Sequence, residues 1–243
     1  MTIHWPLRTL ATVATAGAAL VLTATAASAA GPGSYTLAAT TGATFSVLST
    51  GNLVNVDTDD SLHPLSTSGH GLGRLPFPVH AFDQTYQNIV VDSNGNIRLG
   101  TKGAATLSAD VNGCLTTAAF GGSPDLMAYW DDLTFRTADT SHGFPDGIFT
   151  KTSGTAPHRK FVVSWQGTEN VTQVPVLAQV VFQEGSQTVQ YVYGTDGGAS
   201  ATVGIQSKQQ LTSTQWTCSS GSATAVTAGL RITATHSEGT PPM

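Results

Sequence analysis

The chain has 243 residues, only 10% of them charged, and a net charge of −5. This length is enough for one substantial hydrophobic core. The acidic balance gives no electrostatic footprint for nucleic acid or for anionic membranes, so we expect neither as a partner.

The N-terminus predicts a signal peptide over residues 1–29. Residues 9–26 are apolar, rich in alanine and uncharged, and Ala27-Ser28-Ala29 supplies the small side chains of a cleavage site. The run is rich in Ala and Thr, and Gly31-Pro32-Gly33 follows it, so a cleaved signal is favoured over a membrane anchor. The sequence therefore predicts a secreted, extracellular protein whose mature form has no membrane anchor.

Strand patterns dominate the remaining chain, and no window of a dozen residues has the three-four spacing of a helix. The strongest hairpin signal is Asn94-Gly95 within residues 86–100, because both residues tolerate a positive φ. Gly185-Ser186 predicts a second hairpin. The other predicted strands are residues 35–40, 44–48, 159–165, 174–184, 187–193, 201–206 and 226–233.

These strands predict an all-β fold. Turns recur every eight to fifteen residues or so. The alternation of polar and apolar residues gives each sheet one solvent-facing side, which favours a two-sheet antiparallel β-sandwich of jelly-roll or Ig-like general architecture. A closed β-barrel is the second choice. We expect a single domain over residues 30–235 and a disordered polar tail over 236–243. Long loops are predicted at residues 57–73, 103–123 and 136–146, where a local function would lie.

The two cysteines, Cys114 and Cys218, predict a disulfide, because an even pair in an exported chain is normally oxidised. The alternative is two separate buried thiols. A loop of this length limits the stabilisation to about 4–5 kcal/mol in the chain-entropy model.

A calcium site is one candidate in the first long loop. Asp57, Asp59 and Asp60 carry carboxylate oxygens, which calcium prefers, although the loop lacks the glycine and distal glutamate of an EF-hand. The alternative is a solvated acidic turn. Asp92, Asn94 and Asn96 also have a calcium-like spacing, but the predicted hairpin turn accounts for them more simply. No other cofactor is expected.

Catalysis has weaker support. Asp131 and Asp132 follow Tyr129-Trp130 and suggest glycoside hydrolysis, but adjacent residues on a strand point to opposite faces. Glu169 or Glu184 would have to approach one of them, and no pattern in the sequence predicts that. We therefore assign no catalytic residue and expect no enzymatic activity.

Several short segments, taken in order, resemble the nidogen-type (NIDO-like) extracellular domain, as found in secreted bacterial β-sandwich modules. The segments are residues 57–61, 75–78, 84–86, 91–100, 126–133, 147–150, 154–165, 180–185 and 201–206. The resemblance implies an extracellular, non-catalytic module associated with adhesion. Where relatives read Phe-Pro-Phe-Tyr-Gly, this chain has residues 77–83 as FPVHAFD, so we expect a reshaped strand end there.

The leading hypothesis is a secreted, non-catalytic module for recognition or adhesion, which binds an extracellular protein or glycan. The alternatives are a carbohydrate-active enzyme or lectin-like glycan binder, and a structural protein of an extracellular matrix or coat. Trp130 and Trp165 are expected to fill the core between the sheets, and an exposed sugar-stacking platform is the alternative for both.

Overall fold

The computed structural model describes residues 33–49, 52–55, 60–70, 73–100, 112–115, 124–136, 141–207, 212–218 and 226–237. The predicted signal peptide, residues 1–29, lies outside the described residues, as do two of the three predicted calcium ligands, Asp57 and Asp59. No helix in the described ranges is long and apolar enough to cross a membrane.

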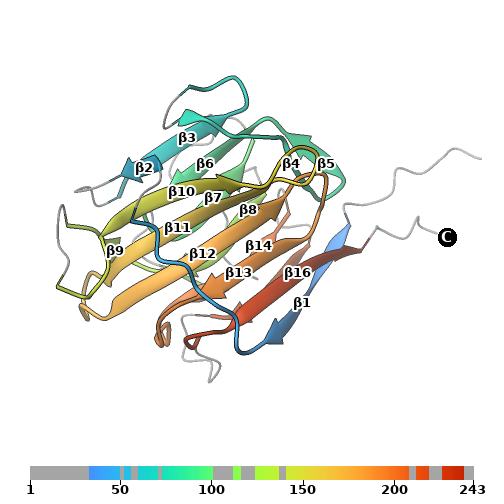
Figure 1. Cartoon of the computed structure of the whole chain (residues 1–243). Coiled ribbons are helices and arrows are strands. Elements are labelled where there is room, and N and C mark those ends of the chain that lie inside the picture. Colours follow the sequence, from blue (N-terminus) through green and yellow to red (C-terminus); the bar gives the residue numbers. More distant parts are fainter. Residues whose placement is uncertain are drawn as a thin grey trace, which may run out of the picture.

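The fold consists of two antiparallel sheets packed face to face, with a short separate hairpin (Figure 1). The first sheet has the order β1-β16-β13-β12-β11-β10-β2, with β9 paired to β11, and the second has the order β15-β14-β8-β7-β6-β3. The strands are β1 (Ser34–Thr40), β2 (Asn52–Asn55), β3 (Leu62–Ser66), β4 (Val79–Ala81), β5 (Gln84–Tyr86), β6 (Asn88–Asp92), β7 (Asn96–Leu99), β8 (Asp125–Trp130), β9 (Leu133–Thr134), β10 (Gly147–Ser153), β11 (Lys160–Glu169), β12 (Pro175–Gln183), β13 (Val189–Tyr193), β14 (Thr202–Gln206), β15 (Ser213–Thr217) and β16 (Arg231–Ser237). The predicted β-sandwich is confirmed, and the closed barrel is wrong, because each main sheet has two open edge strands among the described residues.

The core lies between the two sheets and follows the predicted alternation. Phe161, Val163 and Trp165 of β11 point into it, as do Val189, Tyr191 and Tyr193 of β13. The second sheet contributes Val91, Ile97, Leu126 and Ile205 from four neighbouring strands. Burial of these side chains is the main favourable contribution to folding.

Three aromatic side chains of the first sheet donate hydrogen bonds to backbone oxygens of the second. Trp165 Nε1 donates to Asp92 O at 2.8 Å, Tyr191 to Gly204 O at 2.8 Å, and Tyr193 to Ala128 O at 2.7 Å. The oxygen of Gly204 lies where the pairing of β14 shifts register. These buried donors therefore satisfy carbonyl groups and also fix how the two sheets pack.

The hairpin predicted around Asn94-Gly95 is confirmed, as β6 and β7, but its turn differs from the expectation. Gly95 has a φ of +78°, and Asn94 does not have a positive φ. A three-residue loop with glycine in the left-handed region is a common alternative to the two-residue turn. The side chain of Asn94 instead binds neighbouring loops, accepting from Leu133 N at 3.1 Å and donating to Asp60 Oδ1 at 2.9 Å.

The strand predicted at residues 44–48 is wrong. This segment crosses the outer face of the first sheet without pairing as a strand (Figure 1). The side-chain oxygen of Gln166 accepts from Leu48 N at 2.7 Å, and the side-chain nitrogen of Gln166 donates to Leu48 O at 3.1 Å. The side chain of Gln179 donates to Ser46 O at 2.8 Å. Side-chain amides from the sheet thus bind the backbone that strand pairing would have used.

The last strand lies further along the chain than predicted. The prediction places a strand at residues 226–233 and a tail from residue 236, whereas β16 runs from Arg231 to Ser237. His236 and Ser237 pair with Tyr35 and Ser34 of β1. The structure also contains strands that the sequence patterns do not predict. These are the edge strands β2, β3 and β15, the interior strands β8 and β10, and the short strands β4, β5 and β9.

The predicted disulfide is confirmed: Cys114 and Cys218 are bonded, with their Cα atoms 5.1 Å apart. It anchors residues 112–115 to the end of β15. Asn112 donates to Trp130 O at 2.7 Å, and Leu115 donates its backbone N–H to Gln215 Oε1 at 3.0 Å.

Candidate functional site: an acidic corner

Two loops meet at one edge of the sandwich and bring three carboxylates together. Asp131 and Asp132 link β8 to β9, and Glu169 ends β11, where it pairs with Leu133 of β9. Asn170 connects the two loops. Its backbone N–H donates to Asp132 O at 2.8 Å, and its side-chain Nδ2 donates to Asp132 Oδ2 at 3.1 Å. We call Asp131, Asp132 and Glu169 the acidic corner.

Two carboxylates of the acidic corner accept several hydrogen bonds from uncharged donors. Glu169 accepts from the hydroxyl groups of Tyr129 and Thr172, both at 2.5 Å. Asp131 accepts from Ser200 Oγ at 2.6 Å and from the backbone of Asp132 at 3.0 Å. These bonds hold the carboxylates in place without neutralising their charge.

The surroundings of the corner disfavour ionisation of Asp131. Burial raises the pKa of this carboxyl group, and the nearby charges of Glu169 and Asp132 raise it further, while hydrogen bonds from Ser200 and Asp132 act in the opposite direction. Burial also raises the pKa of the Tyr129 phenol, which stays a hydrogen-bond donor at neutral pH. Among the described residues, no ion pair involves these three carboxylates.

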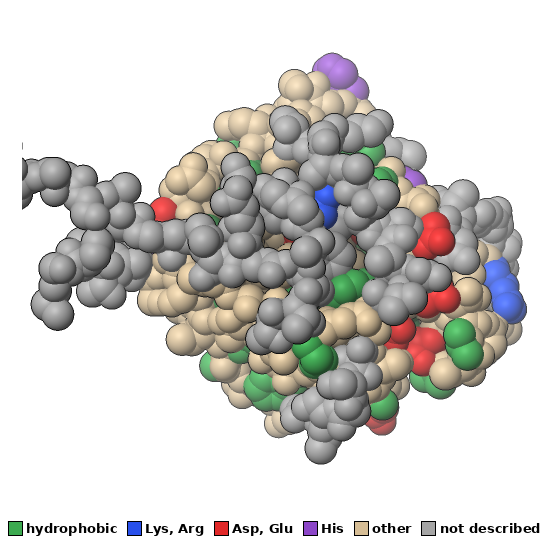
Figure 2. Space-filling view, turned by 180° about the vertical axis from the view of Figure 1, so that it is seen from behind, with side chains coloured by type: hydrophobic (Ala, Val, Ile, Leu, Met, Phe, Trp, Pro, Cys, Tyr) green, Lys and Arg blue, Asp and Glu red, His purple; other side chains and the backbone are tan. Residues whose placement is uncertain are grey.

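Apolar side chains lie beside the acidic corner. Val171, in the turn between β11 and β12, is 85% exposed, and Val174 in the same turn is 37% exposed. Figure 2 shows acidic side chains gathered on the side of the molecule that carries β9 in Figure 1, with hydrophobic side chains next to them. Exposed apolar groups with a polar rim are typical of contact surfaces.

Part of this corner is visible in the sequence. The sequence singles out Asp131 and Asp132, and it offers Glu169 as a partner that would have to approach them. The pairing of Glu169 with Leu133 of β9 brings it there. No signal in the sequence predicts this pairing, because the two strands are far apart in the chain and β9 is only two residues long.

The predicted calcium loop is only partly described. Asp60 has a φ of +52° and accepts a hydrogen bond from Asn94 Nδ2, while Asp57 and Asp59 lie outside the described residues. Within the described ranges, no group of three or more His, Cys, Asp or Glu side chains is arranged to hold a metal ion.

The two tryptophans predicted to fill the core are buried, Trp130 at 2% exposure and Trp165 at 0%. Neither can stack on a sugar from solvent. The expected position in the core between the sheets is confirmed for Trp165, whereas Trp130 is buried but is not part of that core cluster among the described residues, and the exposed platform is wrong for both.

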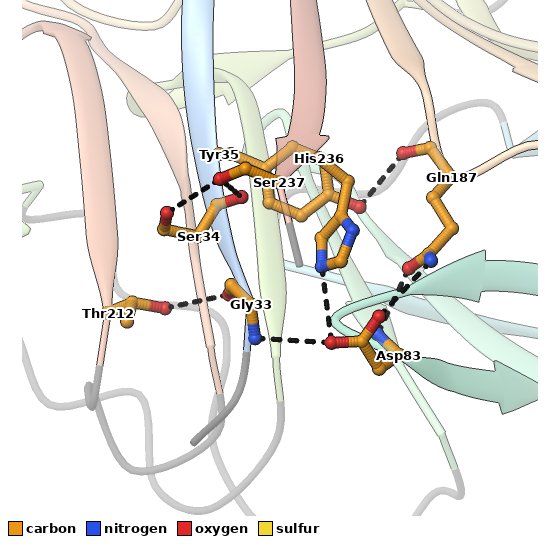
Figure 3. A network of polar contacts seen from close by, with 8 residues as sticks. All are labelled: Gly33, Ser34, Tyr35, Asp83, Gln187, Thr212, His236 and Ser237. Carbon is orange, nitrogen blue, oxygen red and sulfur yellow. Dashed lines mark hydrogen bonds and ion pairs between the residues drawn. The ribbon is translucent and has the colours of Figure 1, made fainter. Parts of the chain in front are cut away.

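A second polar cluster joins the first and last strands to the β4–β5 hairpin (Figure 3). The Asp83 carboxylate accepts from Gly33 N at 3.3 Å and lies 3.5 Å from His236 Nε2. The side chain of Gln187 donates to the Asp83 carboxylate and accepts from the Asp83 backbone N–H. Phe82 and Asp83 have φ values of +50° and +59°, a conformation that costs non-glycine residues energy. The reshaped strand end expected at residues 77–83 stays a prediction, and the polar contacts of Asp83 tie the β4–β5 hairpin to Gly33, just before β1, and to His236 of β16.

Among known protein families, the NIDO-related family model matches residues 34–240. Comparisons with curated proteins and with solved structures gave no match. The matched range includes both sheets, the disulfide and the acidic corner. The chain therefore belongs to the NIDO-related family.

Proposed function

We propose that this chain is a secreted, non-catalytic module for extracellular recognition or adhesion, and that its acidic corner contacts a protein partner. Secretion is supported by the signal-like pattern of residues 1–29 and by the disulfide, since disulfides persist in oxidising compartments. Membership of the NIDO-related family supports an extracellular role.

The observation that carries the proposal is Val171, a large aliphatic side chain with 85% exposure beside three carboxylates. A partner that covers Val171 would gain from the burial of apolar surface. The charge of the corner favours a partner with Lys or Arg residues around an apolar contact, because complementary charge speeds and orients association.

The test uses a photo-crosslinking amino acid at position 171 and, as a matched control, at Thr152, an exposed residue near the other end of the first sheet. Each protein is irradiated with the secreted and surface fractions of cells that produce the chain. We expect one discrete crosslinked protein from position 171 and none from position 152. Val171→Ser should weaken retention of that protein at least about fivefold, since important interface contacts typically exceed about 1 kcal/mol.

The result against the proposal would be equal crosslinking at both positions, or retention that Val171→Ser and Asp132→Asn leave unchanged. Retention of a purified glycan in place of a protein would favour the lectin-like alternative.

Hydrolysis of a glycan is the second candidate, and one observation favours it. Glu169 lies close enough to Asp131 to raise its pKa, so two carboxyl groups meet at the same edge. This function requires release of reducing sugar from extracellular polysaccharides, and loss of that release in Asp131→Asn. We expect no release from the wild-type protein.

A further inference from the structure

The closed end of the β6–β7 hairpin carries two buried polar side chains on the side of the sheet away from the core. Val91 and Ile97 are paired and point into the core, so Asp92 and Asn96, the next residue on each strand, point to the other side. Asp92 is 0% exposed and Asn96 is 1% exposed. Facing positions of this kind bring side chains within contact distance.

Both side chains have polar atoms without a hydrogen-bond partner in the described structure. Asp92 Oδ1 accepts from the backbone of Asn94 at 2.9 Å, but Asp92 Oδ2 accepts no bond. Neither Oδ1 nor Nδ2 of Asn96 is bonded, so the amide can present its oxygen in either orientation. Buried polar groups are rarely left unsatisfied, and two such residues side by side indicate an occupant.

The charges around Asp92 favour a cation as that occupant. Asn94 connects Asp92 to Asp60, since it donates its backbone N–H to the first and its side chain to the second, each at 2.9 Å. The cation in this region, Arg98, lies 3.0 Å from Asp125 and forms a buried ion pair with it. Among the described residues, Arg98 forms its ion pair with Asp125, and no ion pair involves Asp60 or Asp92.

A bound water would supply hydrogen bonds to the two open oxygens, but no charge. A divalent cation supplies both an electrostatic partner for these oxygens and the missing charge.

We propose that Asp92 and Asn96 form a calcium site, with the carboxylate of Asp60 beside it. The carboxylate oxygen of Asp92 and the amide oxygen of Asn96 are the hard donors that calcium prefers, and extracellular calcium is abundant enough to fill weak sites. The site differs from the one predicted at residues 57–60, because its ligands are on the hairpin and only Asp60 is common to both.

Terbium, which replaces calcium in oxygen sites, provides a direct readout. Trp165 Nε1 lies 2.8 Å from Asp92 O, so its indole ring is on the core side of the strand that carries Asp92 and is near enough to transfer excitation energy to the ion. We expect terbium luminescence on excitation of tryptophan in the full chain, and its loss when excess calcium competes.

Two variants locate the ion. Asp92→Asn keeps the shape of the side chain and removes its charge, while Asp132→Asn removes a carboxylate of the acidic corner and serves as the control. At calcium about a hundredfold above its Kd, we expect the wild-type and Asp132→Asn proteins to melt about 5–10 °C higher than in chelator. Asp92→Asn should give no calcium shift and no terbium signal, with an unchanged circular dichroism spectrum.

Equal melting temperatures of the wild-type protein in calcium and in chelator would overturn the proposal. So would a calcium shift that persists in Asp92→Asn. A shift that Asp59→Ala abolishes and Asp92→Asn preserves would place the ion in the preceding loop and would also contradict a site on the hairpin.

Discussion

Tyr129 and Tyr193 are both buried, and their hydroxyl groups donate to acceptors of different charge. Tyr129 donates to the Glu169 carboxylate and Tyr193 to the carbonyl oxygen of Ala128. A hydrogen bond to a charged group contributes about 1.5–3 kcal/mol, against about 0.5–1.5 kcal/mol for a neutral pair. The same chemical change should therefore have different effects at the two positions.

We expect Tyr129→Phe to lower the free energy of unfolding by about 2–3 kcal/mol and Tyr193→Phe by about 1 kcal/mol. Urea unfolding monitored by tryptophan fluorescence measures both. Equal losses would mean that the carboxylate of Glu169 finds another donor when the Tyr129 hydroxyl is removed.

Arg159 and Glu184 form a two-pronged ion pair at the surface. The Arg159 guanidinium donates to both carboxylate oxygens, at 2.9 and 2.5 Å, and its third nitrogen donates to Pro76 O at 2.8 Å. The bonds from Arg159 lower the pKa of Glu184 from 4.5 to about 2. An acid with a lowered pKa in the folded state contributes stability that is complete above its unfolded pKa and is lost as the pH falls through the folded pKa.

Glu184→Gln should therefore lower the melting temperature at pH 5–7, and the difference from wild type should shrink between pH 4.5 and pH 2. Arg159→Lys, which keeps the charge and loses the two-pronged geometry, should give an intermediate loss. Thermal unfolding followed by circular dichroism across this pH range is the measurement. A difference that is constant with pH would show that packing, and not the ion pair, is responsible.

At the scale of the elements, two hairpin turns with similar glycine conformations have different surroundings. Gly95 has a φ of +78°, and a Cβ there would lie 2.0 Å from the backbone oxygen of Tyr129. Gly185 has a φ of +71°, and a Cβ added there would meet no atom within 4 Å. The first turn packs against β8, and the second projects into solvent.

Gly185→Ala should cost about 1–2 kcal/mol, which is the cost of the left-handed conformation alone. Gly95→Ala adds a clash with backbone, which cannot move without breaking the bonds from Ala128 and Tyr129 to Gly95 O, so we expect a loss above about 4 kcal/mol or failure to fold. Equal losses in urea unfolding would mean that the β6–β7 turn is not held against β8.

At the scale of the whole molecule, the disulfide closes a loop with a sequence separation of 104 residues. It connects the segment before β8 to the end of β15, so the closed loop contains most strands of the first sheet and half of those of the second. The Cys114→Ser, Cys218→Ser double variant should lose up to about 4–5 kcal/mol of unfolding free energy.

Reduction of the wild-type protein should reproduce the loss measured for the double variant. A variant with unchanged stability would mean that the unfolded chain is already compact, and that the crosslink removes little of its entropy.

Local sequence patterns were enough for much of the fold. Alternation placed Phe161, Val163 and Trp165 on the core face, and Asn94-Gly95 marked a hairpin, because each signal depends on residues close together in the chain. The strand predicted at residues 44–48 was wrong because its conformation depends on residues distant in the chain. Its β-rich composition does not reveal that Gln166 and Gln179 bind its backbone. Likewise, β9 is too short to leave a periodic signal.

The sequence by itself determined the all-β class, the two-sheet packing, the disulfide pair and the core position of Trp165, since these follow from periodicity and from cysteine count. Only the tertiary structure brought Glu169 to Asp131 and left Asp92 and Asn96 buried with unbonded polar atoms. Both arrangements depend on contacts between segments far apart in the chain, and such contacts are fixed by the packing of whole sheets and not by local preference.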